Sequence, residues 1–177
     1  MRHGDKYDEN ISVTGLKQAG QQIDLTNVTD LFFGYLARTA QTLVAALASH
    51  CHKGQTGYVI RVHEAVEEIG SEQEFKKMVT PAWEAAAAKG HDGLTTFMIA
   101  FYTEDEKKPF RDWAMRGLKK MFDQMPDGGY GLACGHDPII PLCAMDCGAV
   151  GHSLKVLEYY DFIQDDAGNI RVVVASD

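Results

Sequence analysis

Arginine and histidine residues stand next to the ends of several predicted strands and helices. Arg2 and His3 lie in an Arg-His-Gly triplet, and Arg38 lies in the first turn of a predicted helix that follows a strand. His136 directly follows another predicted strand. Ligands of a parallel α/β sheet bind beyond the carboxyl ends of its strands, so we expect these side chains to meet at one edge. Two guanidiniums and two imidazoles there suit a dianionic tetrahedral group, because arginine forks match phosphate oxygens in pairs and a neutral imidazole is a nucleophile toward phosphorus.

The elements that hold these residues are predicted from hydrophobic periodicity. Strands are expected at 30–34, 58–62, 130–135, 157–163 and 170–175, the last two around a turn signal at 165–169. Helices are expected at 14–24, 36–52, 71–89, 110–125 and 138–147, with Thr14 and Ser71 as N-caps. Residues 94–102 fit either type, and residues 1–13 are predicted to be loop, with the structure of Met1 to Gly4 left open. Strands that alternate with helices predict a three-layer α/β/α domain with a mainly parallel central sheet.

Composition narrows the function classes further. The 177 residues are 45% hydrophobic and carry 17 Lys+Arg against 25 Asp+Glu, a formal net charge of −8. This balance argues against binding to nucleic acid or to anionic membrane surfaces, although a locally basic pocket for a small anion remains compatible with it. No apolar run approaches the roughly 20 residues that span a bilayer, and Met1 to Asp5 has no signal-peptide character. Four irregularly spaced cysteines do not indicate a disulfide framework, so we expect a reduced, cytoplasmic protein.

Four segments, taken in order, resemble the histidine phosphatase superfamily, which includes the phosphoglycerate-mutase-like phosphatases. They are Arg2-His3-Gly4, the stretch 14–19, the stretch 38–42 and Gly135-His136. The resemblance covers nearly the whole chain and implies one domain, 1–177, with the phosphoglycerate-mutase-like fold. We expect residues 71–108 to cover the pocket and set the substrate. The predicted activity is that of a phosphomonoester hydrolase that acts through a phosphohistidine on a small phosphorylated substrate.

The resemblance also implies roles for individual residues. His3 is the expected nucleophile, Arg2 and Arg38 hold the phosphoryl oxygens, and His136 donates to the same oxygens. The second ring nitrogen of His3 needs a hydrogen-bond acceptor to fix its tautomer, and a nearby backbone carbonyl would serve. We expect no metal or other cofactor, because the two arginines and His136 supply the charge that a metal would otherwise supply.

The proton donor for the leaving oxygen is less well defined by the sequence. Glu64 follows the predicted strand 58–62 and is the favoured acid, with Glu67 and Glu68 as near competitors. Asp137, which we also place among the phosphate-binding residues, directly follows His136 and resembles the donor of the acid-phosphatase branch.

The sequence departs from the family pattern in two places. The family has a strand in the middle of the sheet ahead of its Arg-His-Gly, whereas only Met1 precedes the triplet here, and Gly34 stands where a Ser-Pro-like turn is more usual. Other interpretations are a non-catalytic member that binds phosphorylated ligands, or a phosphoglycerate-type mutase. A zinc site is a further alternative, and its candidate ligands are His50, Cys51, His52, Cys134, His136, Cys143 and Cys147.

Overall fold

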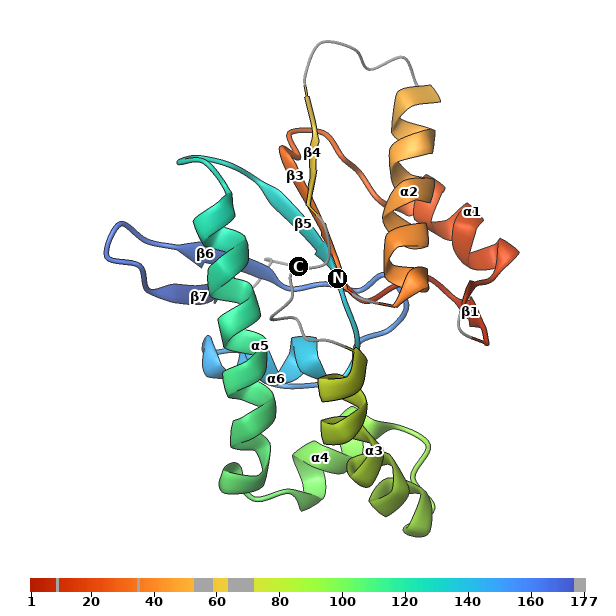
Figure 1. Cartoon of the computed structure of the whole chain (residues 1–177), viewed down its shortest axis with the longest axis vertical. Coiled ribbons are helices and arrows are strands. Elements are labelled where there is room, and N and C mark those ends of the chain that lie inside the picture. Colours follow the sequence, from red (N-terminus) through yellow and green to blue (C-terminus); the bar gives the residue numbers. More distant parts are fainter. Residues whose placement is uncertain (9, 35, 53–58, 64–71, 174–177) are drawn as a thin grey trace.

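A three-stranded parallel sheet forms the centre of the computed structural model, which describes residues 1–8, 10–34, 36–52, 59–63 and 72–173 (Figure 1). Its strand order is β4-β3-β5, with β3 at Asp30–Phe33, β4 at Arg61–His63 and β5 at Gly131–Cys134. Leu31 of β3 lies beside Val62 and Leu132 of the two neighbours. The alternation of strands with helices thus correctly predicted a mixed α/β protein with parallel pairing.

Met1 to His3 run alongside the outer edge of β5. The Met1 ammonium donates to Ala133 O over 2.9 Å, and Gly135 N donates to Met1 O over 2.9 Å. Arg2 forms a parallel bridge with Gly135, so this segment has the same direction as β5. The prediction of loop did not extend to Met1 to Gly4. It was incomplete for the residues that follow, which contain a small antiparallel pair, β1 at Lys6–Tyr7 and β2 at Asn10–Ile11.

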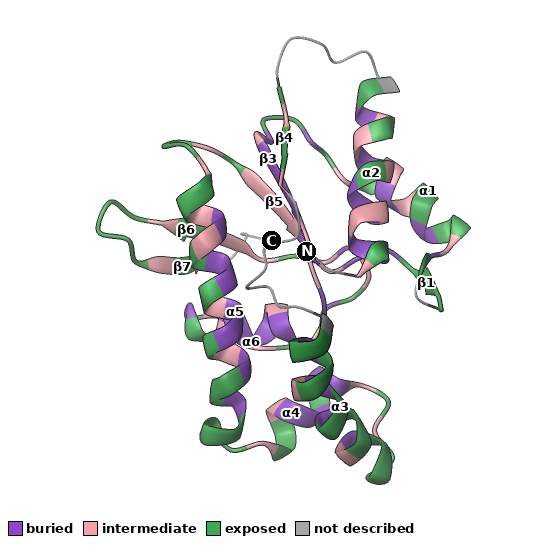
Figure 2. Cartoon of the chain, viewed as in Figure 1, coloured by how far each residue is buried: buried purple, intermediate pink, exposed green. Residues whose placement is uncertain are grey.

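Helices pack on both sides of β3. Leu31 belongs to a buried cluster with Leu43 and Ala46 of α2 (Ala37–His52), against which α1 (Val13–Gln22) packs. Phe32, the next residue along the strand, belongs to a second cluster with side chains of α5 (Glu104–Gln124) and α6 (Ile139–Asp146). This division follows from the strand period of two. Figure 2 shows the buried faces of α2 and α5 turned toward the interior.

The remaining elements sharpen the predicted boundaries. Helix α3 spans Glu72–Ala88, and the ambiguous stretch is helix α4, Leu94–Phe101. Ser12 rather than Thr14 caps α1, because its hydroxyl accepts from Gly15 N. The proposed cap at Ser71 lies outside the described residues.

Helix α5 begins six residues before the predicted start at Phe110. The Thr103 hydroxyl accepts from Glu106 N, and the Glu106 carboxylate accepts from Thr103 N. This capping box satisfies backbone donors at the helix start, which extends the helix beyond its apolar stripe.

The chain continues after α6 into an antiparallel hairpin of β6 (Asp161–Gln164) and β7 (Ile170–Val173). Its turn is held by Asp165, whose carboxylate accepts from the backbone N–H of Ala167 and of Asn169. The hairpin prediction is confirmed, although the first strand begins four residues later than expected. The predicted end of the second strand lies outside the described residues. Among the described residues, no helix combines the length and the apolar character needed to cross a membrane.

Candidate active site

His3 and His136 lie side by side at the carboxyl edge of the sheet. Their ring centroids are 5.3 Å apart, and both side chains are buried. His136 follows β5, and His3 follows the segment that pairs with β5 in parallel, so the strand-end expectation accounts for their meeting. Gly34, at the end of β3, completes this edge, since a Cβ there would lie 3.6 Å from His136 Cε1.

Arg38 and Arg2 share this pocket with the two imidazoles. Arg38 is buried, with only 9% of its surface exposed, and the charges of both arginines act on the pKa of both histidines. The Arg2 guanidinium also donates through Nη1 to the carbonyl of Leu154. The structure thus brings together the four residues that the sequence singled out for a phosphoryl group.

The tautomer of His3 is set by the main chain. His3 Nδ1 lies 2.7 Å from Gly4 O, and a carbonyl oxygen only accepts, so Nδ1 carries the proton. The partner is a backbone carbonyl, which the sequence suggested as one acceptor that would serve. Nε2 is left with its lone pair, which is the state in which a ring nitrogen attacks phosphorus.

Both imidazoles are held neutral. Burial lowers the pKa of His3 from its ordinary 6.5 to about 4, and the charges of Arg38 and Arg2 act in the same direction. Burial also places the pKa of His136 well below its ordinary range, again with Arg38 as the leading charge. A bound dianion would oppose the arginine charges and raise both pKa values. Two neutral imidazoles therefore stand close to two cationic guanidiniums.

A single hydroxyl connects the His3 loop to helix α2. Gly4 N donates to Thr42 Oγ1 over 3.0 Å, and Thr42 Oγ1 donates to Arg38 O over 2.7 Å. Thr42 is fully buried. The sequence analysis included Thr42 in a motif but gave it no role, and its spacing of four residues from Arg38 on a helix is the signal that identifies it.

The loop approaches α1 so closely that side chains are excluded. A Cβ at Gly15 would collide with Asp5 O, and a Cβ at Gly4 would lie 3.1 Å from Gly15 O. Two glycines are therefore needed to place His3 against its pocket.

Of the candidate acids, the structure describes only Asp137. Its Oδ2 accepts from the Ser153 hydroxyl over 3.0 Å, whereas Oδ1 is buried with no hydrogen-bond partner among the described residues. Glu64, Glu67 and Glu68 lie outside the described residues. The sequence analysis missed Ser153 and Leu154, which contact Asp137 and Arg2 from an irregular segment that carries no periodic signal.

Phe75 links the predicted substrate-covering segment to the pocket. It lies near the start of α3, and its ring centroid is 5.8 Å from that of His136. The same ring packs 5.9 Å from Trp113 of α5. An aromatic wall therefore stands on the His136 side of the site.

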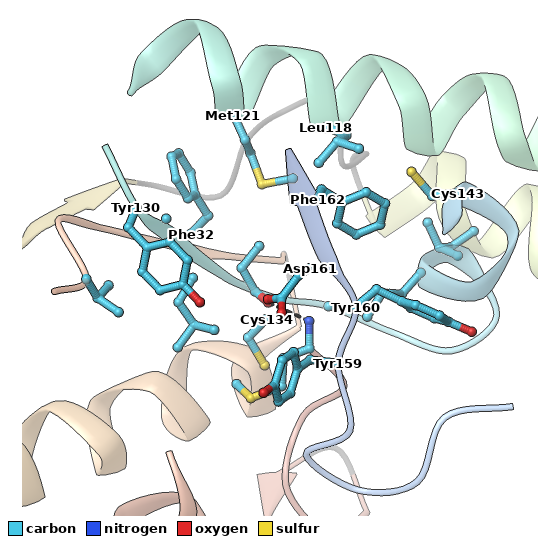
Figure 3. Close-up of a pocket in the computed structure, with 18 of the residues that line it drawn as sticks. Phe32, Leu118, Met121, Tyr130, Cys134, Cys143, Tyr159, Tyr160, Asp161 and Phe162 are labelled. Atoms are coloured by element: carbon cyan, nitrogen blue, oxygen red, sulfur yellow. Dashed lines mark hydrogen bonds between the residues drawn. The ribbon is translucent and has the colours of Figure 1, made fainter. Parts of the chain in front are cut away.

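A cavity of about 590 Å³ lies along β5, α5 and β6 (Figure 3). Apolar side chains dominate its walls, among them Phe32, Leu118, Met121 and Phe162. Among the described residues, its lining contains no lysine or arginine, and His136 is the one member of the four-residue site that reaches it. Its chemistry does not suit a phosphate, so we place the candidate active site at the histidine pair rather than in this cavity.

The zinc alternative was tested against the described residues. Within them, no three His, Cys, Asp or Glu side chains gather as a metal site would require. No protein-family model matches the chain, and no curated protein matches it either.

Proposed function

We propose that this protein is a phosphomonoester hydrolase of the histidine phosphatase superfamily that acts through a phosphohistidine at His3. The observation that carries the proposal is the buried pair His3–His136, 5.3 Å apart, with Arg2 and Arg38 in the same pocket. Neutral imidazoles beside two guanidiniums form a site selective for a tetrahedral dianion. The substrate class is a small phosphorylated molecule, and inorganic phosphate is the product.

The finer architecture is part of the same proposal. We assign the chain to the three-layer phosphoglycerate-mutase-like fold. Parallel pairing of Met1 to His3 with β5 supports this assignment, because it places the proposed nucleophile at the end of an extended segment beside the sheet. The helices on both sides of β3 also support it.

Catalysis would proceed in two displacements. His3 Nε2 attacks phosphorus while the bond to the leaving oxygen breaks, and Arg2, Arg38 and His136 stabilise the charge on the phosphoryl oxygens. A carboxylic acid gives its proton to the leaving oxygen. Water, deprotonated by the same carboxylate, then attacks the phosphohistidine, which releases phosphate and restores neutral His3.

The acid is Glu64 or Asp137, and leaving-group chemistry separates them. An alkyl alcohol needs a proton as it departs, whereas nitrophenolate departs readily without one. Replacing the acid by its amide should therefore reduce hydrolysis of an alkyl phosphate far more than that of 4-nitrophenyl phosphate. We favour Glu64→Gln as the variant with this selective loss. The same pattern in Asp137→Asn, with Glu64→Gln unaffected, would transfer the role to Asp137.

Hydrolysis of 4-nitrophenyl phosphate tests the proposed function. Turnover should persist in EDTA and disappear in His3→Ala, with His152→Ala, at an exposed imidazole, as the matched control. EDTA-sensitive turnover would favour a metal hydrolase. Absence of turnover together with vanadate binding would favour the non-catalytic alternative. Phosphate transfer between positions of a phosphoglycerate would favour a mutase.

The expected location is also a proposal. We place the protein in the cytoplasm, and the four cysteines support a reducing compartment because all are free thiols.

A further inference from the structure

Three sulfur atoms from two helices meet on the side of α6 that packs against α5. Cys143 Sγ lies 3.4 Å from Met115 Sδ, and Cys147 Sγ lies 3.7 Å from the same atom. Both thiols therefore contact the same thioether sulfur. Both cysteines are buried, and the proposed phosphatase chemistry uses none of the three residues. We propose that Met115, Cys143 and Cys147 form a binding site for Cu⁺.

The ligand set decides which metal the site would take. Thiolate and thioether sulfurs are soft ligands that favour Cu⁺, whereas structural zinc takes four Cys, His or carboxylate ligands. No third His, Cys, Asp or Glu joins Cys143 and Cys147 among the described residues, and Met115 occupies that place instead. Three sulfurs without a fourth ligand match the trigonal coordination of a soft monovalent cation.

The distances from Met115 Sδ to the two cysteine sulfurs fit such an ion closely. A metal–sulfur bond is about 2.3 Å long, so three sulfurs around one ion in a plane stand about 4 Å apart. The two distances to Met115 Sδ are 3.4 and 3.7 Å, so the side chains would open by only a few tenths of an ångström. Met115 has three rotatable side-chain bonds that can supply this adjustment.

The spacing of Cys143 and Cys147 suits a disulfide less well than a shared metal ion. Cys143 and Cys147 are four residues apart, at the end of α6 and at its C-cap, and residues at this spacing have Cβ atoms about 5–6 Å apart. Disulfides need Cβ atoms about 3.5–4.5 Å apart. The two thiols can therefore share a partner more readily than they can bond to each other.

The surroundings of the sulfurs leave them within reach of a cation. Arg111 Nε lies 3.1 Å from Asp146, the residue before Cys147, so this neighbouring carboxylate is paired with a guanidinium. Cys143 also lines the large cavity, which gives an ion a route to the sulfurs (Figure 3).

Binding breaks two S–H bonds, forms three Cu–S bonds and releases two protons. Copper enters and stays as Cu⁺, so no oxidant or reductant takes part.

Anaerobic titration with Cu⁺ against a chromogenic Cu⁺ chelator tests the site. The full chain should carry Cys51→Ser, which removes the exposed thiol that stands between two histidines. We expect one Cu⁺ per chain, with an X-ray absorption spectrum of three sulfurs at about 2.3 Å. Met115→Leu should weaken Cu⁺ binding at least about tenfold. Mutating a residue that only contacts a metal ligand commonly lowers metal affinity by that factor, and Met115 is proposed as a ligand itself.

Met121→Leu, on the same helix and also buried, is the matched control and should bind like the parent. Both leucine variants conserve volume, so both should fold, which circular dichroism verifies. Loss of copper binding in the Cys51→Ser parent would place the metal on the exposed thiol and overturn the proposal. Equal affinity and an unchanged spectrum in Met115→Leu would overturn it as well.

Discussion

Acid should destabilise this protein because its two buried histidines take up protons on unfolding. In the unfolded chain His3 takes a proton near pH 6.5, whereas in the folded pocket burial holds its pKa at about 4. Between these two values the unfolded state binds more protons than the folded state. The contribution of His3 to stability is therefore complete above pH 6.5 and is lost as the pH falls toward 4.

The size of the effect follows from the same two pKa values. Moving from neutral pH to about pH 4.5 should cost roughly 2 to 3 kcal/mol of unfolding free energy through His3 alone. His136 acts in the same direction, because burial also lowers its pKa. Asp30 contributes in a separate window, since Arg61 holds its pKa well below 3.8 and its contribution is lost only below that pH.

Urea unfolding measured at neutral pH and at about pH 4.5 provides the assay. His3→Asn removes the titrating ring but keeps an amide donor that can reach Gly4 O. This variant should lose roughly 2 to 3 kcal/mol less than the parent over the pH interval. His152→Asn, at an exposed imidazole, serves as the control and should keep the pH dependence of the parent. An identical loss in His3→Asn and the parent would refute the idea that His3 is buried in its neutral form.

Three further predictions concern the pocket. Arg38→Lys keeps the positive charge but loses the two parallel N–H donors of the guanidinium. The value of kcat/KM for 4-nitrophenyl phosphate, measured by steady-state kinetics, should therefore fall by about a hundredfold, as is typical when one hydrogen-bond donor to the transition state is lost. Thr42→Val should cost about 1–3 kcal/mol in urea unfolding, because the buried N–H of Gly4 loses its acceptor, whereas Thr42→Ser should be close to neutral. Orthovanadate at about a hundred times its Kd should add about 2.7 kcal/mol of stability, seen as a higher Tm, and this gain should disappear in Arg38→Ala.

The meeting of the site residues was predictable because it rests on one rule about parallel strands. The strand at 30–34 and the helix at 36–52 have clear hydrophobic patterns, which predict the position of Arg38 just beyond the strand. The predicted end of β5 places His136 at the same edge of the sheet. Pairing of Met1 with Ala133 was not predictable, because a segment of two or three residues has no periodicity and its partner is 132 positions away.

The contacts that complete the site were hidden for different reasons. Thr42 stands in a motif, but only the structure reveals that its hydroxyl joins Gly4 to Arg38. Ser153 and Leu154 come from an irregular segment, so no pattern in the sequence connects them to Asp137 or Arg2. The start of α5 shows the opposite case: the Thr103–Glu106 capping box is visible in the sequence, but the apolar stripe that begins at Phe110 concealed it.

Direct trapping of the phosphorylated enzyme is the most decisive measurement. The protein is mixed with a radiolabelled phosphomonoester, quenched in alkali, which preserves phosphohistidine, and digested with trypsin. Cleavage after Arg2 and Lys6 yields the peptide 3–6, in which His3 is the only histidine. The proposal predicts label on this peptide and none in His3→Ala. Turnover without label on the peptide, or label that persists in His3→Ala, would contradict the phosphohistidine mechanism.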